Sequence, residues 1–160
     1  MALLLQELFV PGRIKCHLQA EDKSEIFEEL VDFLATHYGL DCRDDILDAI
    51  IRREAKMSTG IKRGIAIPHA KTNFTDGVIG VLGISDGGID YESLDGEPVH
   101  MLFFLVSSEE DAGTHLSVLK KIALLVENPD FYRDACAAAD SEKVHAVLRS
   151  SEEILDSHKS

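Results

Sequence analysis

The segment VHMLFFLV at residues 99–106 is apolar at every position except His100. A strand this uniformly apolar is typical of the middle of a sheet that is covered on both faces. The segment VIGVLGI at residues 78–84 has the same character. We therefore expect two buried strands, with helices elsewhere in the chain covering both faces of their sheet.

Helical patterns lie on both sides of these strands along the chain. Asp22 and Glu25 form a capping box, behind which apolar residues recur at helical spacing until Gly39. A second helix is expected over residues 43–53, with an acidic first turn. Its apolar stripe consists of Ile46, Leu47, Ile50 and Ile51. Further helices are predicted over about residues 114–126, from Asn128-Pro129 and from Asp140.

The remaining segments are shorter. Residues 13–18 alternate weakly and predict a short strand, whereas residues 58–64 have the composition of a loop. Residues 65–67 predict another short strand, which Pro68 ends. Turn residues over 87–96 suggest a small separate hairpin. Helices that alternate with apolar strands indicate the α/β class.

Length and composition indicate one layered domain over residues 1–150, followed by a polar tail over residues 151–160 that frays. No apolar run reaches the ~18 residues that cross a bilayer, so we expect no membrane insertion. The first residues lack a basic region and a cleavage site, which argues against a signal peptide. Three widely spaced cysteines fit a reduced compartment, and we expect a cytoplasmic protein.

The distribution of charge along the chain indicates which classes of partner it can bind. The net charge of −13 argues against nucleic acid, whose phosphates require a basic surface. Within this acidic chain, residues 52–71 carry six basic side chains and a single acidic one, Glu54. A local positive field of this kind can hold an anion. Ordinary cations on a solvated loop give the same pattern, so charge alone leaves both interpretations open.

His69 is the first candidate for a functional residue. It follows the predicted strand at residues 65–67 directly, and Pro68 fixes the direction in which the chain continues. Gly60 and Gly64 allow close approach of the backbone nearby. Ligands of α/β proteins bind beyond the carboxyl ends of strands. The alternative is a histidine that is merely exposed in a loop.

His115 is the second candidate, because it opens the helix that follows the strand at residues 99–106. It shares a helical face with Leu119 and Ile122, so we expect its ring to point inward. If the strands before His69 and His115 are parallel, both rings meet at one edge of the sheet. The alternative is a histidine packed beneath a loop.

Arg53 is the third candidate, at the end of the second predicted helix and on the rim of its apolar stripe. Its planar donors suit a phosphate group. The alternative is an exposed cation that only interacts favourably with the helix dipole. The other histidines are expected at the surface, except His100, whose place in an apolar strand indicates a structural role.

His69, His115 and Arg53 fit some kinds of functional site better than others. The sequence has no HExxH motif and no paired Cys/His set, so we expect neither a bound metal nor a cofactor. A Ser-His-Asp triad is not excluded by spacing, but no GxSxG motif is present. A phosphohistidine relay needs only an accessible neutral imidazole and donors around the phosphoryl oxygens. His69, His115 and Arg53 would supply these parts.

Several motifs also resemble a known family. The chain is similar to the enzyme IIA domain of the fructose/mannitol type in the bacterial sugar phosphotransferase system, including its nitrogen-regulatory branch. The motifs are Arg53-Glu54, Ser58-Thr59-Gly60-Ile61, residues 64–71 (GIAIPHAK), Gly88-Ile89-Asp90-Tyr91, residues 94–99 (LDGEPV) and residues 115–119 (HLSVL). The resemblance spans nearly the whole chain. It departs at Lys62-Arg63, where members often carry a glycine and a neutral polar residue, so a more basic rim is expected here.

The resemblance implies a mixed sheet between helices and the activity of a phosphotransferase. It places the phosphorylated residue at His69, a stabilising hydrogen bond at His115 and a phosphate-binding arginine at Arg53. The implied donor is a histidine phosphocarrier protein, and the implied acceptor is a cysteine of a IIB domain.

Three hypotheses follow for the role of the chain. The first hypothesis, which we favour, is a stand-alone IIA protein of the nitrogen-regulatory type that acts on a regulated protein through its phosphorylation state. The second is a sugar-transport component that passes the phosphoryl group to a IIB domain. A metal-dependent hydrolase that uses His69 and His115 is the third and fits the sequence least. Neither the sugar, the regulated protein nor the oligomeric state follows from the residues.

Overall fold

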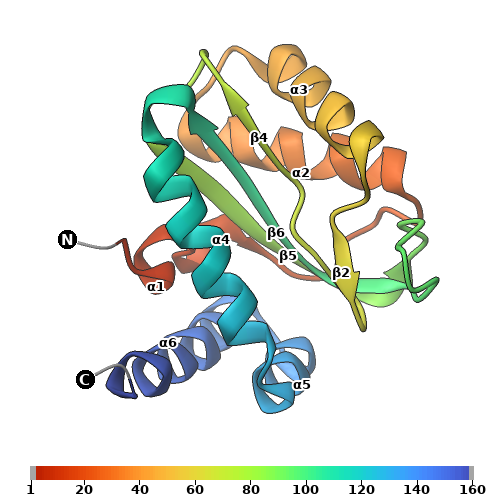
Figure 1. Ribbon diagram of the computed structural model, residues 1–160. Helices are drawn as coiled ribbons and strands as arrows, with labels where there is room; N and C mark the ends of the chain where they lie inside the picture. Colours follow the sequence, from red (N-terminus) through yellow and green to blue (C-terminus); the bar gives the residue numbers. More distant parts are fainter. Residues whose placement is uncertain (1–2, 159–160) are drawn as a thin grey trace.

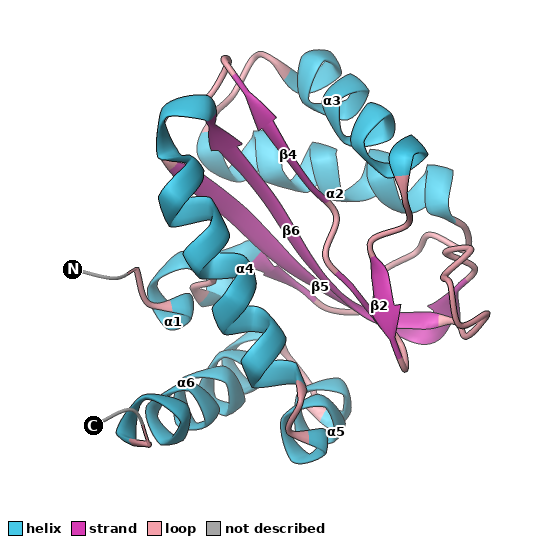
Figure 2. Cartoon of the chain, in the orientation of Figure 1, coloured by secondary structure: helices cyan, strands magenta, loops and turns pink. Residues whose placement is uncertain are grey.

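A mixed β-sheet lies between two groups of helices in the computed structural model, which describes residues 3–158 (Figures 1 and 2). The strands of the sheet are β1 (Ile14–Lys15), β2 (Gly60–Lys62), β3 (Ile65–Ala66), β4 (His69–Thr72), β5 (Val78–Ile89) and β6 (Val99–Ser108). The helices are α1 (Leu5–Leu8), α2 (Lys23–Tyr38), α3 (Arg43–Lys56), α4 (Ala112–Val126), α5 (Pro129–Ala137) and α6 (Ser141–Ser157). Two 3-10 turns, Pro11–Arg13 and Glu109–Asp111, complete the described elements.

Strand β6 organises the sheet, as the apolar run at residues 99–106 predicts. The strand order is β1-β5-β6-β3-β2, and β4 pairs with β6 on the same side as β3. Strand β5 is antiparallel to β6, whereas β3 and β4 are both parallel to it. The expected mixed sheet is thereby confirmed.

Two hydrophobic cores form because successive side chains of β6 point to opposite faces of the sheet. Met101, Phe103 and Leu105 pack in the core beneath α1, α4, α5 and α6. Leu102 and Phe104 pack in the other core, beneath α2 and α3. The chain is therefore layered, with helices on both faces, as Figure 1 shows.

The short strand β3 ends before Pro68, as the sequence predicts, but a second strand that the sequence did not predict follows directly after the proline. The Leu105 amide donates to the Pro68 carbonyl at 3.0 Å, and β4 begins at the next residue. Proline lacks only the amide hydrogen, so its carbonyl can still accept from a neighbouring strand. His69 is consequently the first residue of a strand beside β6.

The glycine-rich segment at residues 58–64 also contains more structure than its composition predicts. Strand β2 lies within it and pairs antiparallel with β3, with an irregular register between Gly60 and Lys62. The small separate hairpin expected over residues 87–96 is absent from the described residues. Instead, β5 continues to Ile89, and residues 90–98 connect it to β6.

Local capping signals placed the helices well. Asp22 Oδ1 accepts from the Glu25 amide at 2.8 Å, and helix α2 ends at Gly39 with φ of 64°. Helix α3 extends past the predicted end at Arg53 to Lys56. Ile51 is 49% exposed and does not belong to the buried stripe of α3.

The expectation that the polar tail over residues 151–160 frays is wrong over residues 151–157, because they form the last turns of α6, and residues 159–160 lie outside the described part of the chain. Glu152 is fully buried and accepts hydrogen bonds from the amides of Leu5 at 2.5 Å and Gln6 at 2.9 Å. Lys121 of α4 forms an ion pair with the same carboxylate at 2.8 Å. A distant tertiary contact therefore orders a segment whose own sequence is polar.

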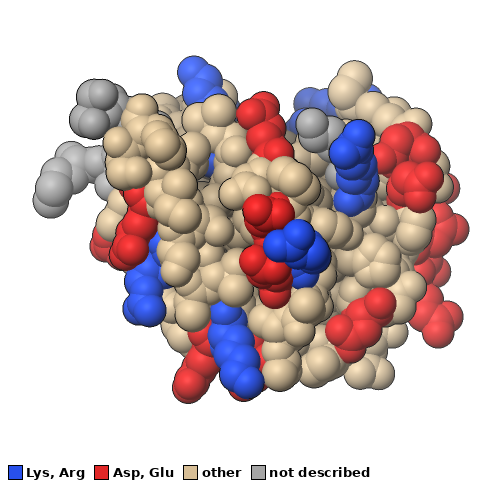
Figure 3. Space-filling view, turned by 90° about the horizontal axis from the view of Figure 1, so that it is seen from below, with Lys and Arg blue, Asp and Glu red and all other residues tan. Residues whose placement is uncertain are grey.

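The surface of the molecule mixes both signs of charge. On the face shown in Figure 3, basic and acidic side chains lie interspersed, without a continuous basic area on that face. Among the helices of residues 3–158, none has the length and apolar character needed to cross a membrane.

Candidate functional site

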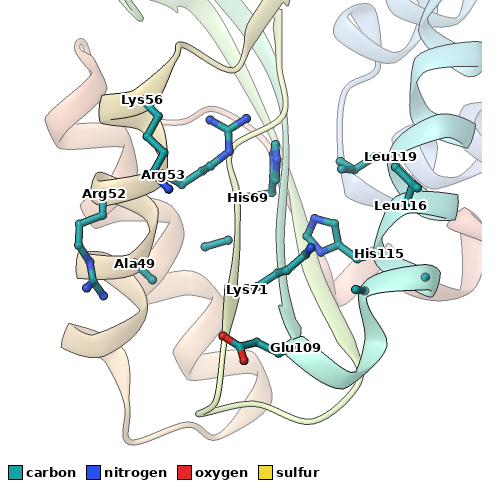
Figure 4. A pocket seen from close by; sticks show the side chains of 13 residues that line it. Ala49, Arg52, Arg53, Lys56, His69, Lys71, Glu109, His115, Leu116 and Leu119 are labelled. Atoms are coloured by element: carbon teal, nitrogen blue, oxygen red, sulfur yellow. The ribbon is translucent and has the colours of Figure 1, made fainter.

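A pocket of about 880 Å³ opens between α3, β4 and the start of α4 (Figure 4). It is lined by Ala49, Arg52, Arg53 and Lys56 of α3, His69, Ala70 and Lys71 of β4, and Glu109, Ala112, Gly113, His115, Leu116 and Leu119. All three residues selected from the sequence thus line one pocket. Their positions agree with the expectation, and their chemical roles stay predictions.

His69 has a defined tautomer. Its Nδ1 lies 2.6 Å from the Ile67 carbonyl oxygen. A carbonyl can only accept, so Nδ1 carries the hydrogen and the lone pair of the ring lies on Nε2. A neutral imidazole with a free Nε2 in a pocket is suited to act as a nucleophile.

The surroundings of His69 favour its neutral form. Burial lowers the pKa of His69 below its ordinary value, and the nearby charges of Arg53 and Lys71 lower it further. The hydrogen bond to Ile67 and the charge of Glu54 oppose these effects without outweighing them. The ring is therefore unprotonated at neutral pH, as a nucleophile must be.

His115 points inward, as its helical position predicts, and only 3% of it is exposed. The centroids of the His69 and His115 rings lie 5.4 Å apart with 57° between their planes. His115 Nδ1 is hydrogen-bonded to Ser107 Oγ of β6. Burial lowers the pKa of His115 to about 4, with further contributions from His69 and Lys71. Two neutral imidazoles thus lie side by side where β4 and α4 meet.

Positive charge comes to the pocket from two elements. Arg53 Nη1 donates to the Met57 carbonyl at 3.1 Å, which ties the arginine to the end of α3. Arg52 and Lys56 of the same helix and Lys71 of β4 line the pocket beside it. Arg52 is ion-paired with Asp48, and Glu109 contributes one negative charge to the lining, but the cationic side chains still outnumber the acidic one, so the pocket attracts an anion.

Arg63 of the expected basic rim is not part of this pocket. Arg63 lies outside the pocket lining, and its amide donates to Asp95 Oδ2 at 2.8 Å. The Lys62 side chain lies outside the described part of the chain. The departure from the family pattern therefore has no described effect on the pocket.

A buried network beneath the pocket was missed in the sequence. Glu54 is 7% exposed and accepts from Thr59 Oγ1 at 2.6 Å and from the Thr59 amide at 2.9 Å. Tyr91 and Lys23 also bond to this carboxylate, at 3.2 Å and 3.0 Å. The sequence did contain a signal for the burial of Glu54, because this residue follows Ile50 by one helical turn on the buried face of α3.

The other histidines lie away from the pocket. His100 Nδ1 donates to the Ser85 carbonyl at 2.9 Å, which agrees with the structural role expected for it. His145 was expected at the surface, but it is half-buried, and its Nε2 donates to the Gln6 carbonyl at 2.8 Å. Within residues 3–158, no group of three or more His, Cys, Asp or Glu side chains is arranged to hold a metal ion.

Sequence comparisons relate the chain to characterised proteins. Residues 7–151 match the family described as phosphoenolpyruvate-dependent sugar phosphotransferase system, EIIA 2. The chain is 33% identical over 144 residues to the PTS system fructose-specific EIIABC component of Bacillus subtilis, covering 90% of this chain but 23% of that protein. It is 30% identical over 144 residues to the nitrogen regulatory protein of Bradyrhizobium diazoefficiens, covering 90% of this chain and 94% of that protein.

Solved structures share the fold. The nitrogen regulatory protein IIA-Ntr from Neisseria meningitidis superimposes with a TM-score of 0.83 at 26% identity, covering 90% of this chain and 98% of that one. Enzyme IIA for mannitol, in a complex with phosphorylated IIB from Escherichia coli, gives a TM-score of 0.74 at 13% identity. That alignment covers 87% of this chain and 95% of the mannitol protein, and it shows the fold alone.

Proposed function

The chain belongs to the EIIA 2 family of the phosphoenolpyruvate-dependent sugar phosphotransferase system, and we propose that it is a phosphocarrier phosphorylated on His69. The observation that carries this proposal is the hydrogen bond from His69 Nδ1 to the Ile67 carbonyl. It leaves Nε2 as the only lone pair of the ring, in a pocket lined by four cationic side chains.

The donor in this proposal is a histidine phosphocarrier protein that carries a phosphoryl group on its own imidazole. The Nε2 lone pair of His69 attacks the phosphorus and forms a new N–P bond. The bond to the donor breaks, and its electron pair returns to the donor's imidazole. Phosphoryl transfer depends mostly on positioning and charge stabilisation. Arg53 and Lys71 offset the charge of the phosphoryl oxygens, and His115 donates a hydrogen bond to one of them.

The destination of the phosphoryl group distinguishes two roles. We favour a regulatory role of the nitrogen-regulatory type, in which the phosphorylation state controls contact with another protein. The likeness to IIA-Ntr, at a TM-score of 0.83, supports this role. The alternative is transfer to a cysteine of a IIB domain, and the match to a fructose-specific component supports it. A fructose- or mannitol-type IIB domain, offered to the phosphorylated protein, accepts the group rapidly only in the second case.

The test of the central claim is phosphorylation by a labelled phosphocarrier protein. We expect one acid-labile phosphoryl group per chain, attached to Nε2 and identified by NMR of isotope-labelled protein. His69→Ala should abolish the label. His17→Ala is the matched control, because His17 is exposed and bonded to Asp86. Full labelling of the His69→Ala protein would refute the proposal.

A second variant tests the role proposed for His115. His115→Ala keeps the acceptor but removes the hydrogen bond to the phosphoryl oxygens. We expect slower transfer and a shorter lifetime of the phosphorylated protein, with the same final stoichiometry of label. Unchanged kinetics would reduce His115 to a packing residue.

A further inference from the structure

Ser107 occupies an unusual place at the end of the apolar run of β6. It is fully buried, although it is polar. Its Oγ is hydrogen-bonded to His115 Nδ1, and no second polar partner lies within hydrogen-bond distance of Oγ among residues 3–158. Because Ser107 has no exposed surface, it cannot reach a substrate directly. Any effect on chemistry must pass through His115.

The direction of this hydrogen bond follows from counting donors. A serine hydroxyl has one hydrogen, and a neutral imidazole has one hydrogen on either nitrogen. If Nδ1 donated to Ser107, the hydroxyl hydrogen would be buried without an acceptor, which is unfavourable. If the hydroxyl donates to Nδ1, both groups are satisfied. The remaining hydrogen of His115 then lies on Nε2.

The charge state of His115 agrees with this assignment. Burial, with smaller contributions from His69 and Lys71, lowers the pKa of His115 to about 4, so the ring holds a single hydrogen at neutral pH. A neutral ring can help a phosphoryl group only if its one hydrogen faces that group. The other tautomer would present a lone pair to the phosphoryl oxygens and repel them.

The two rings of the pocket are therefore complementary. A backbone carbonyl holds the hydrogen of His69 on Nδ1, and Ser107 holds the hydrogen of His115 on Nε2. We propose that Ser107 is a positioning residue, which selects the tautomer of His115 that donates to the phosphoryl group on His69. This inference rests on the proposed phosphorylation of His69 and names a residue that controls it.

The first experiment measures the tautomer directly in unphosphorylated protein. Nitrogen-15 chemical shifts of His115 should show a lone pair on Nδ1 and a hydrogen on Nε2. In Ser107→Ala, the shifts should move toward a mixture of both tautomers. A hydrogen on Nδ1 of His115 in the unchanged protein would overturn the inference. This readout is independent of phosphorylation, so it stands even if His69→Ala refutes the proposed function.

The second experiment measures transfer. Loss of a hydrogen bond to a charged group should shorten the lifetime of the phosphorylated protein about tenfold in Ser107→Ala. Ser107→Thr keeps the hydroxyl and should restore most of the lifetime. Ser108→Ala is the matched control, because the adjacent hydroxyl donates to Asp111 and does not contact His115. Thermal unfolding of each variant verifies that it is folded.

A double-mutant cycle decides whether Ser107 acts through His115. In a His115→Ala background, Ser107→Ala should cause no further change in lifetime. An equal loss in both backgrounds would show that Ser107 acts by another route, and the inference would be wrong. An unchanged lifetime in Ser107→Ala alone would also overturn it.

Discussion

The two faces of the sheet each bury one glutamate, and the two residues serve different parts of the molecule. Glu54 lies on the buried face of α3, where it bonds mainly to side chains, those of Thr59, Tyr91 and Lys23. Glu152 lies on the buried face of α6, where it bonds to two backbone amides of α1 and to Lys121 of α4. The residue type is the same on both faces, but the partners differ.

The partners decide what each carboxylate supports. Glu54 fixes Thr59, whose carbonyl accepts from the Ile67 amide at 2.9 Å. The Ile67 carbonyl in turn holds His69. Glu152 instead holds the first and last helices together, away from the pocket lining. One buried charge therefore supports the pocket, whereas the other supports assembly of the chain.

The largest expected effect on stability belongs to Glu152→Ala. Removing one partner of a buried ion pair costs about 3 to 5 kcal/mol, because Lys121 and the amides of α1 lose their acceptor. We expect this loss in the free energy of unfolding measured with denaturant. The exposed neighbour Glu153 provides the control variant, Glu153→Ala. At temperatures where Glu152→Ala is folded, a strongly reduced rate of phosphoryl transfer would show that Glu152 also supports the pocket.

Glu54→Gln should have a smaller effect on stability and a larger one on function. The amide group replaces an acceptor by a donor beside Thr59 and Lys23, at a cost of about 2 to 3 kcal/mol. Because the support of Ile67 and His69 is loosened, we also expect slower phosphorylation. The exposed residue Asp45 of the same helix gives the control, Asp45→Asn. Wild-type kinetics in Glu54→Gln would show that the network is only structural.

His115 of α4 should make the free energy of unfolding depend on acid pH. The unfolded chain protonates His115 near the ordinary pKa of 6.5, but the folded protein does so only near about 4. As the pH falls below 6.5, the unfolded state binds the proton first and the folded state loses relative stability. Between pH 7 and pH 5 this loss reaches about 2 kcal/mol. Denaturant unfolding of His115→Gln should show a correspondingly weaker pH dependence, and identical profiles would contradict the prediction.

The smallest expected effect belongs to Tyr91→Phe. The ring stays in the core, and only the hydroxyl contacts with Glu54 and Thr59 are lost. A hydrogen bond of this kind contributes about 1 kcal/mol, and the carboxylate keeps its other donors. Thermal unfolding and transfer kinetics should both lie close to those of the unchanged protein. A loss as large as that of Glu54→Gln would show that Tyr91, rather than the carboxylate, organises the network.

Local signals in the sequence predicted the main elements. Capping residues such as Asp22 and Asp140 fixed where helices begin, because their side chains satisfy free amides of the first turn. The apolar run of β6 identified the centre of the sheet. Strand β4 was missed because it pairs with the distant strand β6, which the residue type at Pro68 does not reveal. Strand β2 pairs with the neighbouring strand β3 through an irregular register between Gly60 and Lys62, which a loop-like composition hides.

The three residues selected from the sequence lie together in the structure, but the buried polar residues were missed. His69, His115 and Arg53 were selected from their places next to strands and helix ends, and the structure brings them to one pocket. Ser107, which contacts His115, is a polar residue whose burial depends on tertiary contacts, and the same holds for Glu152 away from the pocket. Glu54 follows Ile50 by one helical turn and so carried a periodic signal of burial, but no structural role was predicted for it.

The pairing of β6 also has a consequence for the order of folding. Strand β5 joins it through the short connection at residues 90–98, so this antiparallel pair closes a small loop. Strand β4 joins it from much farther along the chain, with His69 beside Leu105. Local contacts generally form earlier than distant ones. We expect the β5–β6 hairpin to belong to the folding nucleus and the pocket to assemble last, so that mutations around His69 mainly accelerate unfolding.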